Sequence, residues 1–213
     1  MFAGQVEFEP AASPETLDSE ILNCCITEHL KLRPLKLSDT HALFALTEAN
    51  RNYLRQWLPW LDDNQKADDT RQFIQTSLEK AQTRDEYVSA ICCDQKIVGM
   101  IGLHDISWPN RSGGIGYWLA KSQQGEGMMT RACQSMMDYG FTTLNLNRID
   151  ICCAAKNSRS EAVAKRLGLT YEGLLRDAEW LYDHFVDHKV YSMLRREWQT
   201  QFFTEETPPT PPA

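Results

Sequence analysis

The residues best suited to chemistry lie where a glycine-bearing turn leads into a helix. The turn spans 122–127 and ends in Gly125-Glu126-Gly127, and apolar or small side chains then recur at helical spacing from Met129 to Phe141. The first N–H groups of a helix lack partners within it and carry the positive end of its dipole. Glycines let the backbone bend tightly and approach a ligand closely. We interpret the stretch either as a plain tight turn or as an anion site for a phosphate or pyrophosphate.

Two common phosphate-binding motifs are excluded at this turn. No Gly-Lys-Ser/Thr follows the glycines, so the turn is not a P-loop. Thr130 stands where the dinucleotide fingerprint requires its third glycine. The choice between a tight turn and an anion site therefore depends on the rest of the chain.

The elements around the turn predict an α+β fold. Three antiparallel strands lead into the turn and the long helix, which differs from a doubly wound pattern. Ser158 and Glu161 have the spacing of a capping box at the start of a later helix. Strands are predicted over 26–35, 87–93, 96–104, 115–119, 148–155, 169–176 and 185–195, with a polar loop before the last, and helices over 40–49, 70–83, 129–141 and 158–167.

Composition and charge indicate an ordinary globular protein. The chain has 213 residues, of which 42% are hydrophobic and 24% charged. We expect a domain over 23–200, an N-terminal extension over 1–22 and a disordered proline-rich tail over 201–213. The net charge of −7 argues against direct nucleic-acid binding and suits a cationic amine or basic peptide. With neither a membrane-spanning apolar run nor a secretory signal in the sequence, we expect a cytoplasmic protein without membrane contact.

The cysteines predict neither a metal site nor disulfides. There are seven, and six of them form three adjacent pairs whose side chains would face opposite sides of a strand. No Cys-x-x-Cys or His-spaced set suggests zinc. We expect reduced thiols that are buried as small apolar side chains.

Four stretches together resemble the GNAT (GCN5-related) N-acetyltransferases, and within them the RimJ/RimL-type enzymes that acetylate the N-termini of ribosomal proteins. They are LRPLKLSDTHALFAL with NRNYLRQWLPWLDD, GIGYWLAKSQQGEGMMTRA, NSRSEAVAKRLGLTYEG and LYDHFVDHKVYSML. The resemblance covers about residues 26–196. It implies a mixed, mostly antiparallel central sheet of about six to seven strands flanked by about four helices.

The resemblance also implies acetyl-CoA as the acetyl donor, with no metal. The strand ending at Leu119 would lie beside the pantetheine arm, and the turn would hold the pyrophosphate. Ser122 departs from the family's usual Gln or Arg, so one side-chain contact to the pyrophosphate is lost while the backbone contacts remain. The implied donor-binding residues are Trp118, Leu119, Gln124, Gly125, Gly127, Met128, Met129, Thr130 and Asn157.

By the same resemblance, an amine attacks the thioester directly, which requires a base for the amine and an acid for the departing thiolate. Many family members supply the acid from a tyrosine where this chain has Ala164, so Ser160 is the nearest hydroxyl, with solvent as the alternative. We favour Glu179 as the base, acting through a water, although it could be a solvated loop carboxylate. Asp177 and Asp183 are candidates for binding a cationic N-terminus. An acyl-cysteine route through Cys153 is the alternative to direct transfer.

The aromatic segment 53–60 is the second candidate for contacting the acceptor. Tyr53, Trp57 and Trp60 could form the walls of a cleft or belong to the core. The predicted acceptor is the N-terminal α-amino group of a protein, in particular a ribosomal protein. The alternatives are a small-molecule amine acetyltransferase acting on polyamines or aminoglycosides, and a non-catalytic acyl-CoA-binding regulator. The oligomeric state, a homodimer included, is left open.

Overall fold

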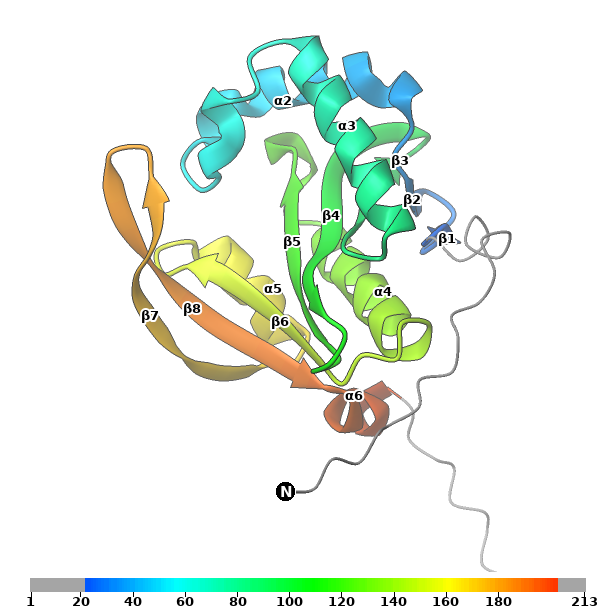
Figure 1. Ribbon diagram of the computed structural model, residues 1–213, viewed down its shortest axis with the longest axis vertical. Helices are drawn as coiled ribbons and strands as arrows, with labels where there is room; N and C mark the ends of the chain where they lie inside the picture. Colours follow the sequence, from blue (N-terminus) through cyan, green and yellow to red (C-terminus); the bar gives the residue numbers. More distant parts are fainter. Residues whose placement is uncertain (1–21, 203–213) are drawn as a thin grey trace, which may run out of the picture.

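The computed structural model describes residues 22–202, and within them it contains one eight-stranded sheet and five α-helices (Figure 1). The strands are β1 Cys24–Cys25, β2 Leu30–Pro34, β3 Tyr87–Cys93, β4 Lys96–Ser107, β5 Ser112–Leu119, β6 Arg148–Ala154, β7 Thr170–Leu181 and β8 His184–Leu194. The α-helices are α2 Thr40–Leu54, α3 Ala67–Gln82, α4 Met128–Thr142, α5 Ser158–Arg166 and α6 Arg195–Phe202. Short 3₁₀ turns lie at η2 Leu37–Asp39, η3 Pro59–Asp62 and η4 Lys121–Gln123.

The sheet opens between its two central strands. Its order is β1-β2-β3-β4-β5-β6-β8-β7, and every pair is antiparallel except β5 with β6. β5 and β6 pair only from Ser112 opposite Arg148 to Gly114 opposite Asp150. Beyond Gly114 the two strands part, so the rest of β5, up to Leu119, has no strand partner on the β6 side. A buried polar backbone edge of this kind requires other partners.

Helices cover both faces of the sheet, because side chains alternate along each strand. On one face, Met136, Met137 and Phe141 of α4 pack with Ile101 and neighbouring strand residues, which we call the first core. On the other face, α2, η3 and α3 contribute a second core. It contains Leu43, Leu54, Leu61 and Ile74, and Trp118 of β5 packs into it.

The predicted α+β, mostly antiparallel architecture is confirmed, with one strand and one helix more than expected. The extra elements are the two-residue strand β1 and the helix α6. The predicted strand over 26–35 is shorter, since β2 begins only at Leu30. The predicted extension and tail lie outside the described residues, except for Leu22, which is buried, and residues 201–202, which end α6.

The predicted polar loop before the last strand is wrong. β7 continues to Leu181 and β8 begins at His184, so the two strands form a hairpin with a tight turn at Tyr182 and Asp183. The register of the pair shifts between Leu175 and Glu179. All but three of the twelve β7 side chains are exposed, so no alternation of apolar and polar residues marked the strand.

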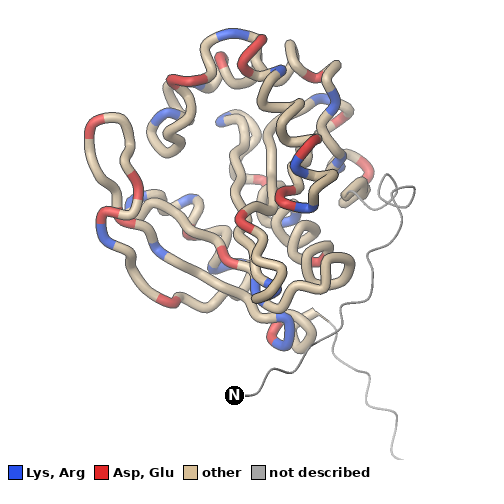
Figure 2. The backbone as a smooth tube through the Cα atoms, viewed as in Figure 1, with Lys and Arg blue, Asp and Glu red and all other residues tan. Residues whose placement is uncertain are grey.

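The expectation of buried thiols is only partly met, because Cys25 and Cys152 are exposed. All seven are free, and Cys92 packs into the second core while Cys93 packs against the first. Within residues 22–202, no group of three or more His, Cys, Asp or Glu side chains could hold a metal ion. In that same span, every helix is too short or too polar to cross a membrane. Lys and Arg are interspersed with Asp and Glu along the chain (Figure 2).

Candidate active site

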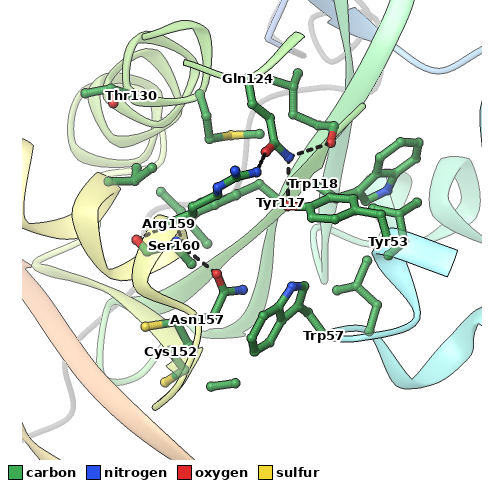
Figure 3. Close-up of a pocket in the computed structure, with 18 of the residues that line it drawn as sticks. Tyr53, Trp57, Tyr117, Trp118, Gln124, Thr130, Cys152, Asn157, Arg159 and Ser160 are labelled. Carbon is green, nitrogen blue, oxygen red and sulfur yellow. Dashed lines mark hydrogen bonds between the residues drawn. The ribbon is translucent and has the colours of Figure 1, made fainter. Parts of the chain in front are cut away.

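A cavity of about 430 Å³ lies where β5 and β6 part (Figure 3). Its walls come from five places in the chain: the end of α2, the last half of β5, the turn before α4, the end of β6 with the first turns of α5, and the β7–β8 hairpin. All of the predicted donor-binding residues line this cavity, as do both predicted catalytic residues, Glu179 and Ser160. We call it the first cavity.

The glycine turn presents a helix N-terminus to the first cavity. Gly125 and Gly127 have φ of 96° and 75°, a region that favours glycine, and Gly127 is the residue that caps α4. No side chain caps the helix. The hydroxyl of Thr130 in the first turn is buried and, within the described chain, has no hydrogen-bond partner. Free backbone N–H groups and an unpartnered hydroxyl therefore border one cavity, as an anion site requires.

Gln124 connects three walls of the first cavity. Its Nε2 donates to the Tyr53 hydroxyl at 2.7 Å and to the Leu119 carbonyl at 3.3 Å, and its Oε1 accepts from Arg159 (Figure 3). The turn is thereby tied to α2, β5 and α5. This network was missed from the sequence, because its hydrogen bonds join residues up to 71 positions apart in the chain.

The first turn of α5 is built differently from the predicted capping box. Asn157 is the capping residue, and its Oδ1 accepts from the Ser160 N–H at 3.2 Å. The Ser160 hydroxyl lies 2.9 Å from the Tyr117 hydroxyl, which comes from β5. Burial raises the pKa of Tyr117 well above its usual value, so this phenol stays protonated. Tyr117 was missed from the sequence because its contact with Ser160 spans 43 residues.

Glu161, the other predicted capping residue, instead anchors α5 to β8. Its carboxylate accepts from Lys165 on its own helix, and from Lys189 and the Tyr191 hydroxyl on β8, each at 2.8 Å. Lys165, followed by Lys189 and Tyr191, lowers the pKa of Glu161 to about 2. This contact holds the helix that carries Asn157 and Ser160 in place.

Glu179 reaches the first cavity from β7, just beyond the register shift. Its Oε2 lies 3.3 Å from Nε2 of His188 on β8, and both side chains line the cavity. They are 28% and 19% exposed, respectively. His188 was missed from the sequence because the contact arises only in the hairpin, where Glu179 pairs with Val186 and His188 lies two residues further along β8. The arrangement puts a carboxylate and an imidazole side by side in the wall of the cavity.

The predicted acceptor-binding residues separate into two groups. Tyr53 and Trp57 line the first cavity, whereas Trp60, Asp177 and Asp183 do not. Trp60 lies in η3 and lines a different cavity. Asp183 is 88% exposed at the hairpin turn, where it lies 2.7 Å from His184. Asp177 is exposed, and its backbone N–H donates to Asp187.

The cysteines at the end of β6 are protonated thiols. Cys152 and Cys153 both line the first cavity. Burial raises the pKa of Cys153, and it raises the pKa of Cys152 to about 11. A thiol with a raised pKa is a weak nucleophile at neutral pH, which disfavours an acyl-cysteine route.

Comparison with known proteins shows which families and structures this chain resembles. The family model of the acetyltransferase (GNAT) domain matches residues 29–170. The putative ribosomal N-acetyltransferase YdaF of Bacillus subtilis is 34% identical over 180 residues, which cover 84% of this chain and 98% of that protein. The ribosomal-protein-serine acetyltransferase of Escherichia coli is 30% identical over 169 residues, covering 79% and 94%. The structure of RimL, a ribosomal L7/L12 α-N-protein acetyltransferase in complex with coenzyme A, superposes with a TM-score of 0.78 at 29% identity, covering 81% and 97%.

The Glu161 anchor predicts a pH-dependent stability difference. A carboxylate whose pKa is about 2 when folded and near 4.5 when unfolded stabilises the fold above about pH 4.5, and this contribution is lost as the pH falls through about 2. We expect Glu161→Gln to have a lower urea midpoint than the wild type at neutral pH. The difference should shrink steadily as the pH falls from about 5 towards 2. A difference independent of pH would contradict the anchoring role.

Proposed function

The chain belongs to the GNAT acetyltransferase family and is an acetyl-CoA-dependent N-acetyltransferase; from this premise we propose that its acceptor is the N-terminal α-amino group of a protein, a ribosomal protein in particular. One observation carries the proposal: a single cavity joins the anion-binding turn to the Glu179–His188 pair and the Ser160 hydroxyl. The names of the two curated relatives support the acceptor class. The proposal places the reaction in the cytoplasm.

The residues around the turn fit the donor. The backbone N–H groups that begin α4 and the unpartnered Thr130 hydroxyl would hold the pyrophosphate. The unpaired edge of β5 would bind the pantetheine amides, as a strand binds its neighbour. The Oδ1 of Asn157 accepts a hydrogen bond from the Ser160 N–H. This leaves the Nδ2 of Asn157 to donate a hydrogen bond to acetyl-CoA. Bound acetyl-CoA supplies the activated acetyl group.

On the acceptor side, Glu179 would remove the proton from the attacking amine. An α-amino group has a pKa near 8, so most of it is protonated at neutral pH and must lose a proton before it can attack. Glu179 accepts this proton through a water, and His188, in the tautomer that donates from Nε2, orients the carboxylate. Tyr53 and Trp57 line the same cavity.

On the donor side, Ser160 would protonate the departing thiolate. Tyr117 is 2.9 Å away and protonated, so it donates to the Ser160 oxygen as Ser160 gives up its proton. The backbone of β5 near Leu119 would stabilise the negative charge that develops on the acetyl oxygen. The Asn157 cap fixes Ser160 in the first turn of α5 for this step.

The acceptor class is tested by incubating the enzyme with labelled acetyl-CoA and cell-extract proteins, followed by mass spectrometry. We expect label on N-terminal α-amino groups, with ribosomal proteins prominent, and turnover of peptides that begin with Ala or Ser. Label on lysine side chains alone, or turnover of spermidine without any peptide, would overturn the proposal. Binding of acetyl-CoA without turnover of any amine would instead favour a regulator.

Thr130→Val tests the donor site. Removing a hydrogen bond to a charged phosphate weakens binding by about 1.5–3 kcal/mol, so the KM for acetyl-CoA should rise about tenfold or more. The matched control is Thr142→Val at the other end of α4, where the hydroxyl donates to the Asp138 carbonyl. Equal KM values for the two variants would exclude a contact between Thr130 and the donor.

Glu179→Gln and Ser160→Ala test the two proton transfers. Loss of a general base or acid lowers the rate by about 100-fold to 10,000-fold, so we expect Glu179→Gln to lower kcat at least 100-fold with little change in the KM for acetyl-CoA. Ser160→Ala should lower kcat less, because solvent can replace it in part. If kcat is unchanged in both variants, these assignments are wrong even though the family stands.

A further inference from the structure

A second cavity, of about 580 Å³, lies on the opposite face of β5 from α4. It is enclosed by α2, η3 and α3 above the faces of β3, β4 and β5. Leu58, Tyr117 and Trp118 line both cavities, so the two adjoin at the end of α2 and at the middle of β5. Protein interiors are otherwise close-packed, so a space of this size beside the candidate active site suggests a ligand.

Two glycines form part of the floor of the second cavity. Gly102 of β4 and Gly116 of β5 are direct register partners, and both line the cavity. A Cβ added to Gly116 would lie 3.1 Å from the His104 ring, and one added to Gly102 would lie 3.3 Å from Val88. The two glycines therefore let the His104 and Val88 side chains pack close to the backbone at the floor of the cavity.

The lining of the second cavity combines aromatic and aliphatic side chains with polar ones, the carboxylates of Asp63, Asp69 and Glu86 among them. Trp60 of η3 and Phe73 of α3 both line it, and within the described chain neither ring pairs with another aromatic ring. Trp118, 7% exposed, lines both this cavity and the first. Aromatic faces that are left unpaired favour a flat or apolar guest. Trp60, expected from the sequence to contact the acceptor, thus contributes to this site and not to the first cavity.

We propose that the second cavity receives a large apolar or aromatic side chain from one of the first two residues of the acceptor polypeptide. This rests on the proposed N-terminal acetylation. The amine must lie in the first cavity near Glu179, and successive residues of an extended chain are only about 3.4 Å apart, so a side chain next to the amine can pass Leu58 and Trp118. Trp60 and Phe73 are then specificity-determining residues.

The test compares peptides that differ in one side chain. Peptides carry Ala or Phe at position one or two, and kcat/KM is measured for each with saturating acetyl-CoA. Burying a phenylalanine ring should raise kcat/KM about tenfold or more at one of the two positions. Val88→Phe, which fills the cavity, should reduce this Phe-to-Ala ratio to near one. The matched control is Ile97→Phe, which also packs on the second core but does not line the cavity, and it should keep the ratio.

Phe73→Ala provides a second variant that removes a wall instead of filling the space. It should also lower the Phe-to-Ala ratio. If thermal melting shows that Val88→Phe does not fold, the ratio measured with Phe73→Ala tests the proposal. Peptides acetylated without any preference, or a ratio unchanged in Phe73→Ala and Val88→Phe, would overturn this inference alone. Failure to acetylate any peptide would overturn it together with the proposed function.

Discussion

The separation of β5 from β6 after only three residue pairs is the constraint on which the rest of the structure depends. A parallel pair that closed along its full length would satisfy its backbone groups internally and leave no opening. Because the pair opens, the last half of β5 presents unpaired backbone groups to a cavity, and the turn before α4 lies at the end of the same strand. A strand edge and a helix N-terminus, both polar and both made of backbone, therefore line one space.

An opening in the middle of a sheet must be held by contacts outside the strand ladder. Two kinds of contact hold the two halves of the sheet together. The first core packs α4 across the β5–β6 junction, and Gln124 connects α2, β5 and α5 by side-chain hydrogen bonds. At the far rim, the Tyr182 hydroxyl on the hairpin turn donates to the Leu58 carbonyl, and Arg55 stacks 3.7 Å above the same ring. Packing of the first core across the β5–β6 junction and polar contacts at the rim thus both set the width of the cleft.

Local patterns predicted the parts of the site that one segment can encode. The glycines of the turn, the apolar period of α4 and the β3–β4 hairpin all have signals within a few residues. The sequence could not predict the partners that meet only through the fold, such as Tyr117 with Ser160 or Glu179 with His188. The strand predicted from the sequence ended before the true end of β7 for a related reason. An exposed strand with a register shift carries no periodic signal.

The two sides of the site differ in how strongly they depend on side-chain identity. The proposed donor side is formed mainly by main-chain groups, so it would need glycines at Gly125 and Gly127 but tolerate Ser122, whose side chain is exposed and does not line the cavity. The proposed acceptor side is formed by side chains from separate elements, Trp57 from the segment after α2 and Glu179 from β7. A substitution in one of these elements changes the shape of the acceptor side while leaving the backbone of the turn intact. The fold can therefore vary its acceptor while it keeps one donor.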